Sequence, residues 1–228
     1  MINFIDTSNW QGAYSVGSTG LDAFIVKATE GLDYVDPCCD NQVQQCISEN
    51  KLWGFYHFGL ANDAVSEADY FVDNTVNYFG HGIPVLDWEY DQSVDWVNTF
   101  VERVHERTGV WPWIYANPWR FNQGGVNQNC MRWVASYPNV ASPSFDYAQS
   151  LDCPEADGLV GAWQFCSDGS IPCIDGNVDC DIFYGDENAW RAYAGCCDDG
   201  VGDDSAGVVP AQPDVLENDK YRITVEVK

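Results

Sequence analysis

Basic residues are scarce in this chain, whose 228 residues include 10 Lys and Arg against 35 Asp and Glu, a formal net charge of −25. A surface this acidic repels nucleic acid and anionic membranes, so we exclude both as main partners. Operation at high ionic strength, where charge repulsion is screened, is one hypothesis that accounts for the imbalance.

Long apolar runs and cofactor motifs are also missing. No uninterrupted apolar run approaches the ~18 residues that a membrane helix needs. The first predicted strand begins at Ile2, which leaves no room for a signal peptide, and we expect synthesis without one. The chain has three His and no C-x-x-C, P-loop or dinucleotide-binding motif. We therefore predict no metal site and no cofactor.

Cysteine, in contrast, is abundant, with ten residues in the chain. An even count of this size is typical of structural disulfides in a protein that works outside the cytoplasm. Zinc ligation is the rival reading, but the vicinal pairs Cys38-Cys39 and Cys196-Cys197 do not fit tetrahedral ligand spacing. Buried free thiols are the third alternative. We expect disulfides, whose pairing the sequence does not determine.

The stretch IPVLDWEY at residues 83–90 carries the most informative pattern. Its apolar start predicts a buried strand, and the acids Asp87 and Glu89 follow with one aromatic residue between them. Residues two apart in a strand point the same way, so both carboxyls are expected together at the strand's carboxyl end. Barrels of the α/β class place catalytic residues there, although two solvated acids are the simpler alternative.

Strands and helices alternate along the first half of the chain. Helices are predicted after Asp36, Asp63 and Ser93, each of which suits an N-cap. Strands are predicted at 2–6, 23–28, 53–58, 113–116, 131–135 and 160–165, in addition to the start of the stretch at 83–90. This order implies parallel strands joined by helical crossovers.

The helical signal fades after residue 116. We therefore predict an α/β fold, an irregular TIM-like β/α barrel of about five β/α units followed by strands joined by loops. Its active site is expected at the carboxyl ends of the strands.

Composition changes near residue 198, where an acidic stretch containing Gly and Pro begins. We predict a catalytic domain over 1–197, a linker over 198–214 and a short β-like tail over 215–228. A lone strand is not stable by itself. The tail therefore pairs with the domain, contacts a partner or begins a further unit, and the oligomeric state stays open.

Seven short segments, in order, resemble the lysozymes of glycoside hydrolase family 25, the Chalaropsis-type muramidases common among phage endolysins. They are IDTSNWQG at 5–12, FIVKATEG at 24–31, GFYHF at 54–58, LDWE at 86–89, IYAN at 114–117, WQF at 163–165 and GNVDCDIF at 176–183. The resemblance implies an irregular β/α barrel that cleaves the β-1,4 link from N-acetylmuramic acid to N-acetylglucosamine in peptidoglycan.

The resemblance also implies roles for individual residues. Glu89 matches the proton donor of the family, and Asp6, Asp87 and Asp179 complete its acidic cluster. Tyr56, Tyr115 and Trp163 match groove residues. The family usually has Asn where this chain has Asp181, so the choice between Asp179 and Asp181 stays open.

Three further residues are judged from the pattern alone. Lys27 is a candidate substrate contact whose alternative is an ion pair with Glu30 at a strand end. Trp10 either stacks on sugar or pins the first loop. His57 lies between aromatic residues, which favours a hydrogen-bonded core histidine over an acid or base.

Glycoside hydrolysis needs an acid for the leaving oxygen and a group that stabilises the positive sugar centre. Carboxylates crowded beside aromatic walls keep one of their number protonated near neutral pH, and we assign that role to Glu89 for its longer side chain. Asp87 either attacks the sugar directly or orients the substrate's acetamido group as nucleophile. Both routes retain configuration, and we favour the second.

The sequence thus predicts a peptidoglycan muramidase with bacterial cell wall as its partner. A phage endolysin, made in the host cytoplasm and released by holin-type lysis, would act outside the cytoplasm without a leader. A catalytically silent glycan-binding barrel is one alternative, which we expect to lack one of the paired acids. A hydrolase of chitin-like polymers is the other.

Overall fold

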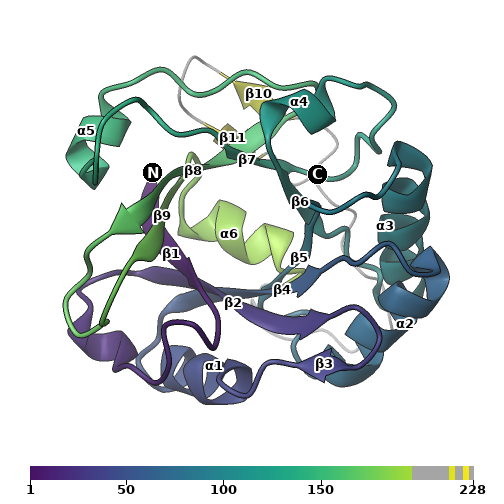
Figure 1. Ribbon diagram of the computed structural model, residues 1–228, viewed down its shortest axis with the longest axis horizontal. Coiled ribbons are helices and arrows are strands. Elements are labelled where there is room, and N and C mark those ends of the chain that lie inside the picture. The colour runs from purple at the N-terminus through teal and green to yellow at the C-terminus, as the bar shows by residue number, and fades with distance from the viewer. Residues whose placement is uncertain (197–215, 219–222, 226–228) are drawn as a thin grey trace, which may run out of the picture.

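The computed structural model describes residues 1–196, 216–218 and 223–225. Eight of its strands close into a barrel of the irregular β/α kind predicted (Figure 1). They are β1 (Ile2–Thr7), β2 (Ala23–Glu30), β4 (Leu52–Phe58), β5 (Ile83–Asp87), β6 (Trp113–Ala116), β7 (Arg132–Ala135), β8 (Val160–Gly169) and β9 (Val178–Phe183).

The last barrel strand breaks the parallel order. From β1 through β8 the neighbouring barrel strands are parallel, but β9 runs antiparallel to both β8 and β1 and so closes the ring. A short strand, β3 (Tyr34–Val35), pairs with the end of β2. The alternation of strands and helices in the first half of the sequence predicts the parallel strands. No helix lies between β8 and β9, so this pattern does not predict β9.

Three full helices cover the outside of the first half of the barrel: α1 (Cys39–Ser48), α2 (Ala64–Thr75) and α3 (Val94–Thr108). Later connections contain only the short helices α4 (Pro118–Phe121) and α5 (Phe145–Gln149), as the fading helical signal predicts. The first loop adds a single 3-10 turn, η1 (Val16–Ser18).

Helix α6 (Glu187–Tyr193) crosses the amino-terminal end of the barrel and lies in the middle of the ring in Figure 1. Trp190 packs against Trp113 and Phe183 inside the barrel, and its indole N–H donates to the Trp53 carbonyl at 3.1 Å. The helix therefore seals one end of the barrel with aromatic side chains and leaves the other end for a site.

Apolar side chains form two layers that alternate along the strands. Phe24 and Val26 of β2 belong to the layer between barrel and helices, whereas Ala23 and Ile25 belong to the barrel interior. This alternation follows from the two-residue period of a strand and matches the near-continuous apolar runs of the predicted strands.

Two helix starts follow the prediction and one does not. The side chains of Asp63 and Ser93 accept N–H bonds at the starts of α2 and α3, and Gly109 ends α3 with a φ of 75°. Asp36 is not the N-cap of α1, since Cys38 occupies that position. The Asp36 carboxylate instead accepts the backbone N–H of Asn9, which ties the start of α1 to the first loop.

Helix α2 packs one face against the barrel and leaves apolar side chains near its two ends exposed. Val65 is 39% exposed and Val76, which follows the helix, is 60% exposed. The helix ends at Thr75 and buries Ala68 and Phe71, because Phe71 fits against Phe55 of β4.

The eight cysteines that precede Cys196 are free thiols, contrary to the disulfides expected from the number of cysteines. Five of these are buried, namely Cys39, Cys46, Cys130, Cys166 and Cys180. Burial raises the pKa of each of these five thiols, so they behave as small apolar side chains. Cys197 lies outside the described residues.

Two short strands, β10 (Leu216–Asn218) and β11 (Ile223–Val225), pair antiparallel with each other. The strand expected in the tail therefore has a neighbour within the tail itself. The predicted linker lies outside the described residues. Among the helices that are described, none is both long enough and apolar enough to cross a membrane.

Candidate active site

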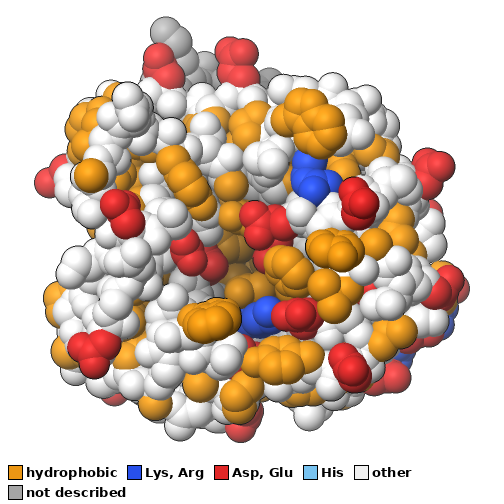
Figure 2. Space-filling view, viewed as in Figure 1, with side chains coloured by type: hydrophobic (Ala, Val, Ile, Leu, Met, Phe, Trp, Pro, Cys, Tyr) orange, Lys and Arg blue, Asp and Glu red, His pale blue; other side chains and the backbone are white. Residues whose placement is uncertain are grey.

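A cleft of about 280 Å³ opens where the barrel strands end. Figure 2 shows acidic side chains gathered in a central hollow of this face, with two small basic patches beside it. The cleft is lined by Asp6, Ser8, Trp10, Lys27, Tyr56, Phe58, Asp87, Glu89, Tyr115, Trp133, Tyr137, Gln164 and Asp179. Eight of the ten predicted site residues therefore meet in it.

The four carboxyls expected to act together come from three parts of the barrel. Asp6 of β1 faces Asp179 of β9 as its register partner, and Asp87 is the last residue of β5. Glu89 follows two residues later, beyond the strand. Their approach depends on the closure of the sheet, since β1 and β9 are neighbours only in the closed barrel.

Trp88 explains why the two acids beside it reach the cleft. Its side chain is fully buried on the opposite side, where the indole N–H donates to the Gln92 carbonyl at 3.0 Å. Its backbone N–H donates to the Tyr115 carbonyl at 2.9 Å, which continues the β5–β6 pairing by one residue. The alternation of side chains across this segment therefore turns Asp87 and Glu89 together toward the cleft.

The carboxyls of the cleft hold protons more tightly than exposed acids do. Burial and the neighbouring Asp179 raise the pKa of Asp6 well above its usual range, and burial and Glu89 do the same for Asp87. Burial and the charge of Glu89 raise the pKa of Asp179 to about 6.

Glu89 itself owes its raised pKa to burial, which Arg120 opposes. Desolvation is therefore the main cause of its affinity for a proton, rather than the ring of aspartates that the sequence suggested. A carboxyl that stays protonated near neutral pH is suited to act as a general acid.

A hydrogen-bond relay fixes Asp6 in place. The Gln164 amide donates to the Asp6 carboxylate at 2.7 Å, and its carbonyl accepts the hydroxyls of Tyr115 at 2.7 Å and Tyr137 at 2.6 Å. The Asp87 carboxyl, in contrast, lines the cleft and accepts no hydrogen bond from the described residues, and its Oδ1 is buried without a partner.

Trp163, expected as a groove residue, points away from the cleft. Its side chain is 3% exposed in the layer between barrel and helices, and its indole N–H donates to the Ser136 carbonyl at 2.6 Å. The next residue, Gln164, takes the cleft position because neighbours in a strand face opposite sides. The WQF segment thus located the site but did not indicate which of its side chains faces it.

Asp181 lies behind the cleft wall and is fully buried, so substrate does not reach it in this structure. Its Oδ1 accepts the Trp133 indole N–H at 2.9 Å. Burial and the nearby Asp6 raise its pKa well above its usual range. Of the two alternatives left open by the sequence, Asp179 is the one in the cleft.

Lys27 and Trp10, for each of which the sequence left two roles open, both line the cleft. The Lys27 ammonium pairs with Glu30 at 2.5 Å and lies 4.9 Å from the centre of the Phe58 ring. Trp10 is 86% exposed. His57 is the hydrogen-bonded core histidine expected, with Glu67 at 2.9 Å.

Five residues of the cleft were not selected from the sequence: Ser8, Phe58, Trp133, Tyr137 and Gln164. Phe58 and Gln164 lie within the segments GFYHF and WQF, so strand alternation could have indicated that they face the cleft. Tyr137 follows β7 in a loop and carries no comparable signal.

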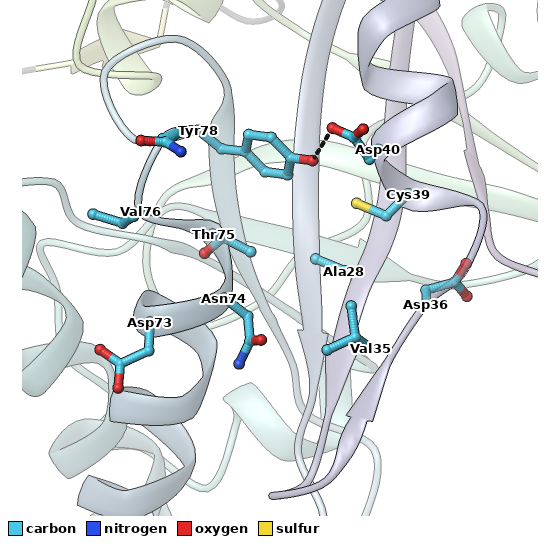
Figure 3. A pocket seen from close by; sticks show the side chains of 11 residues that line it. Ala28, Val35, Asp36, Cys39, Asp40, Asp73, Asn74, Thr75, Val76 and Tyr78 are labelled. Carbon is cyan, nitrogen blue, oxygen red and sulfur yellow. Dashed lines mark hydrogen bonds between the residues drawn. The ribbon is translucent and has the colours of Figure 1, made fainter.

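A second cavity of about 350 Å³ lies between α1 and α2, apart from these acids. Figure 3 shows Tyr78 with its hydroxyl hydrogen-bonded to Asp40, at 3.0 Å, and Cys39 beside them.

Nowhere in the described part of the chain do three or more His, Cys, Asp or Glu side chains form a group that could hold a metal ion.

Comparison with known proteins places this barrel and its acidic cleft among the glycoside hydrolases. Residues 5–174 match the model of the glycosyl hydrolases family 25. An N,O-diacetylmuramidase from Chalaropsis sp. is 31% identical over 195 residues, which cover 75% of this chain and 90% of that protein. The chain belongs to glycosyl hydrolase family 25 and is an enzyme of that class.

Other relatives extend the comparison. The autolytic lysozyme of Clostridium acetobutylicum is 28% identical over 190 residues, 78% of this chain and 55% of that protein, so the match spans little more than half of its length. The bacterial lysozyme of Streptomyces coelicolor has a similar structure, with a TM-score of 0.72 and 26% identity over 85% of this chain and 96% of that one.

Proposed function

We propose that this enzyme is a peptidoglycan muramidase that cleaves the β-1,4 bond between N-acetylmuramic acid and N-acetylglucosamine. The observation that carries the proposal is the convergence of Asp6, Asp87, Glu89 and Asp179 in one cleft at the strand ends. Membership of family 25, with relatives named lysozyme and N,O-diacetylmuramidase, supports this substrate.

Glu89 is the general acid of the proposed reaction. It protonates the oxygen of the leaving N-acetylglucosamine while positive charge develops on the muramic acid ring. Burial raises the pKa of Glu89 and so favours its protonated form. Once the leaving group departs, the Glu89 carboxylate takes a proton from water, which then attacks the sugar from the same face.

Asp87 orients the substrate's own acetamido group as the nucleophile. A buried carboxyl without a hydrogen-bond donor is costly, and Asp87 has none among the described residues. The acetamido N–H of a bound muramic acid would supply this donor and place the acetamido oxygen behind the anomeric carbon. The product then keeps its configuration. Direct attack by Asp87 is the competing route, and it too retains configuration.

The test of function is the Glu89→Gln variant, assayed by mass spectrometry of fragments released from purified cell walls. We expect turnover to fall by ~10²–10⁴, the usual worth of a general acid, with no loss of thermal stability. Glu155→Gln, at an exposed position, is the matched control and should keep full activity. Release of fragments with reducing-end muramic acid supports the proposal, and cleavage of chitin oligomers instead of walls contradicts it.

The nucleophile is tested separately with wall glycan whose muramic acid has lost its N-acetyl group. We expect no cleavage of this substrate, because the acetamido nucleophile is missing. Efficient cleavage would favour direct attack by Asp87. Nuclear magnetic resonance of the first-formed anomer reports on retention.

The proposed substrate implies action outside the cytoplasm on the bacterial wall. Release of a phage endolysin by holin-type lysis is the route we propose. Expression inside bacteria should then lyse cells only when a holin is expressed with the enzyme.

A further inference from the structure

Arg120 differs from the other basic residues of the described chain. Five of them form ion pairs with Asp or Glu, namely Lys27, Lys51, Arg103, Arg107 and Arg191. Arg132 is fully buried and donates to backbone carbonyls. Arg120 is half-buried, and no carboxylate of the described residues lies within ion-pairing distance of it.

Arg120 is held beside the general acid. One of its terminal nitrogens donates to the Glu89 carbonyl oxygen at 2.7 Å, and its guanidinium carbon lies 5.3 Å from the centre of the Trp88 ring. Its backbone N–H donates to the Asn117 side chain at the start of α4. Phe121 is fully buried against Trp88 and anchors the same short helix.

These contacts use one N–H of the guanidinium and leave the others without a partner among the described residues. A guanidinium presents its donors in a fork that matches a carboxylate. In a chain of net charge −25 the ordinary expectation is that every exposed cation is paired. A half-buried arginine that lies next to an acidic cleft, with no carboxylate partner among the described residues, therefore suits an anion that arrives with the substrate.

We propose that Arg120 binds a substrate carboxylate and thereby makes the cleft prefer acid-bearing glycan over neutral, chitin-like glycan. The proposal rests on the proposed function, since muramic acid carries a lactyl carboxyl and, in intact walls, a peptide with further carboxyls. Those carboxyls of the cleft that are ionised repel such a substrate, and Arg120 offsets that repulsion at the rim. Trp119 beside it is 69% exposed and offers an adjacent apolar surface.

Arg120 also lowers the pKa of Glu89, so a change in turnover alone would not identify this role. The experiment therefore measures binding by calorimetry in the Glu89→Gln background, where neither turnover nor Glu89 titration contributes. The ligands are a peptide-free muramic acid tetrasaccharide with free lactyl carboxyls, its methyl ester, the peptide-bearing form and a chitin tetramer.

With Arg120 present, the free acid should bind roughly 5- to 10-fold more tightly than its methyl ester. This ratio lies between the contribution of an exposed ion pair and that of a buried hydrogen bond to a charged group. Arg120→Gln should reduce this ratio to below about 2, and Arg120→Lys should keep part of it because the charge remains. Arg191→Gln removes one exposed, ion-paired arginine of α6 and should keep the full ratio.

A preference that appears only with the peptide-bearing form and disappears in Arg120→Gln assigns the contact to the peptide carboxyls. An unchanged ratio in Arg120→Gln, or equal affinity of the Arg120 protein for all four ligands, overturns the proposal. Wall cleavage by the wild type, measured in parallel, stays intact in that case. Absence of wall cleavage overturns the proposed function and this inference together, so the two failures are distinguishable.

Discussion

Gln164 positions Asp6 in the cleft and is itself positioned by two tyrosines. Its amide N–H groups and carbonyl have distinct partners, with Asp6 on one side and Tyr115 and Tyr137 on the other. A side chain that both donates to a carboxylate and accepts from hydroxyls is difficult to replace, because any apolar residue leaves three polar groups without partners.

We predict that Gln164→Leu lowers kcat/KM on cell walls by ~10-fold, the worth of a hydrogen bond to a charged group. The Gln164 bond lowers the pKa of Asp6, so its loss raises that pKa further and moves the acidic limb of the pH–rate profile to higher pH. Gln44→Leu, on the exposed face of α1, is the control. An unshifted acidic limb would exclude Gln164 from positioning Asp6.

At the residue scale, the sequence predicted the carboxyls of the cleft but not the residues that hold them in position. Asp87 and Glu89 were predictable because alternation along one strand is local information. Trp163 was predicted to face the cleft, but Gln164 does so. Strand alternation shows that two neighbouring side chains point to opposite sides, and it does not show which of them faces the cleft. That choice depends on the direction in which the barrel closes.

At the scale of elements, a buried hydrogen bond between His57 and Glu67 ties β4 to α2. The Glu67 carboxylate, on α2, accepts His57 at 2.9 Å and the backbone N–H groups of Leu60 at 3.0 Å and Asn62 at 2.6 Å. Burial raises the pKa of Glu67, but these hydrogen bonds outweigh burial and lower it overall. One side chain thus fixes both the strand end and the loop that follows.

We predict that Glu67→Ala destabilises the protein by about 3–5 kcal/mol, because it removes the acceptor of the buried His57 Nε2 and of two backbone N–H groups. Urea unfolding followed by circular dichroism measures the change. Glu106→Ala removes an exposed ion pair with Arg103 and should cost below about 1 kcal/mol. Equal effects of the two substitutions would contradict this account of the loop.

Some features of the helices and strands depend on local sequence, and others depend on contacts with distant segments. The caps at Asp63, Ser93 and Gly109 were predictable because each acts within one turn of its helix. The antiparallel strand β9 and the sealing helix α6 were not predicted, since both are defined by contacts with strands far away in the sequence.

At the scale of the whole molecule, buried acids make stability depend on pH. The cleft acids Asp6, Asp87 and Asp179 all have raised pKa values, so the folded protein binds protons more tightly than the unfolded chain. Their stabilising contribution is present at low pH and is lost as pH rises through the folded-state values. For Asp179 that loss falls between about 4, its ordinary value, and its folded pKa of about 6.

We predict that the melting temperature rises by at least ~3 °C from pH 8 to pH 5. This is the change expected in a domain of this length when the raised pKa of Asp179 is converted into unfolding free energy. Differential scanning calorimetry measures it. Asp179→Asn removes one titrating group and should reduce this rise while stabilising the protein at pH 8. A melting temperature that falls over this range would show that other groups dominate.

The sequence by itself determined the class of fold, the run of parallel strands and the positions of the acids at strand ends, because these follow from local periodicity and short motifs. Only the tertiary structure decided which side chains face the cleft and that β9 closes the ring against β1. It also decided that the eight cysteines before Cys196 stay free, and that Arg120 lies beside Glu89 with no carboxylate partner among the described residues. Each of these depends on which distant segments become neighbours. Periodicity within a strand carries no information about that choice.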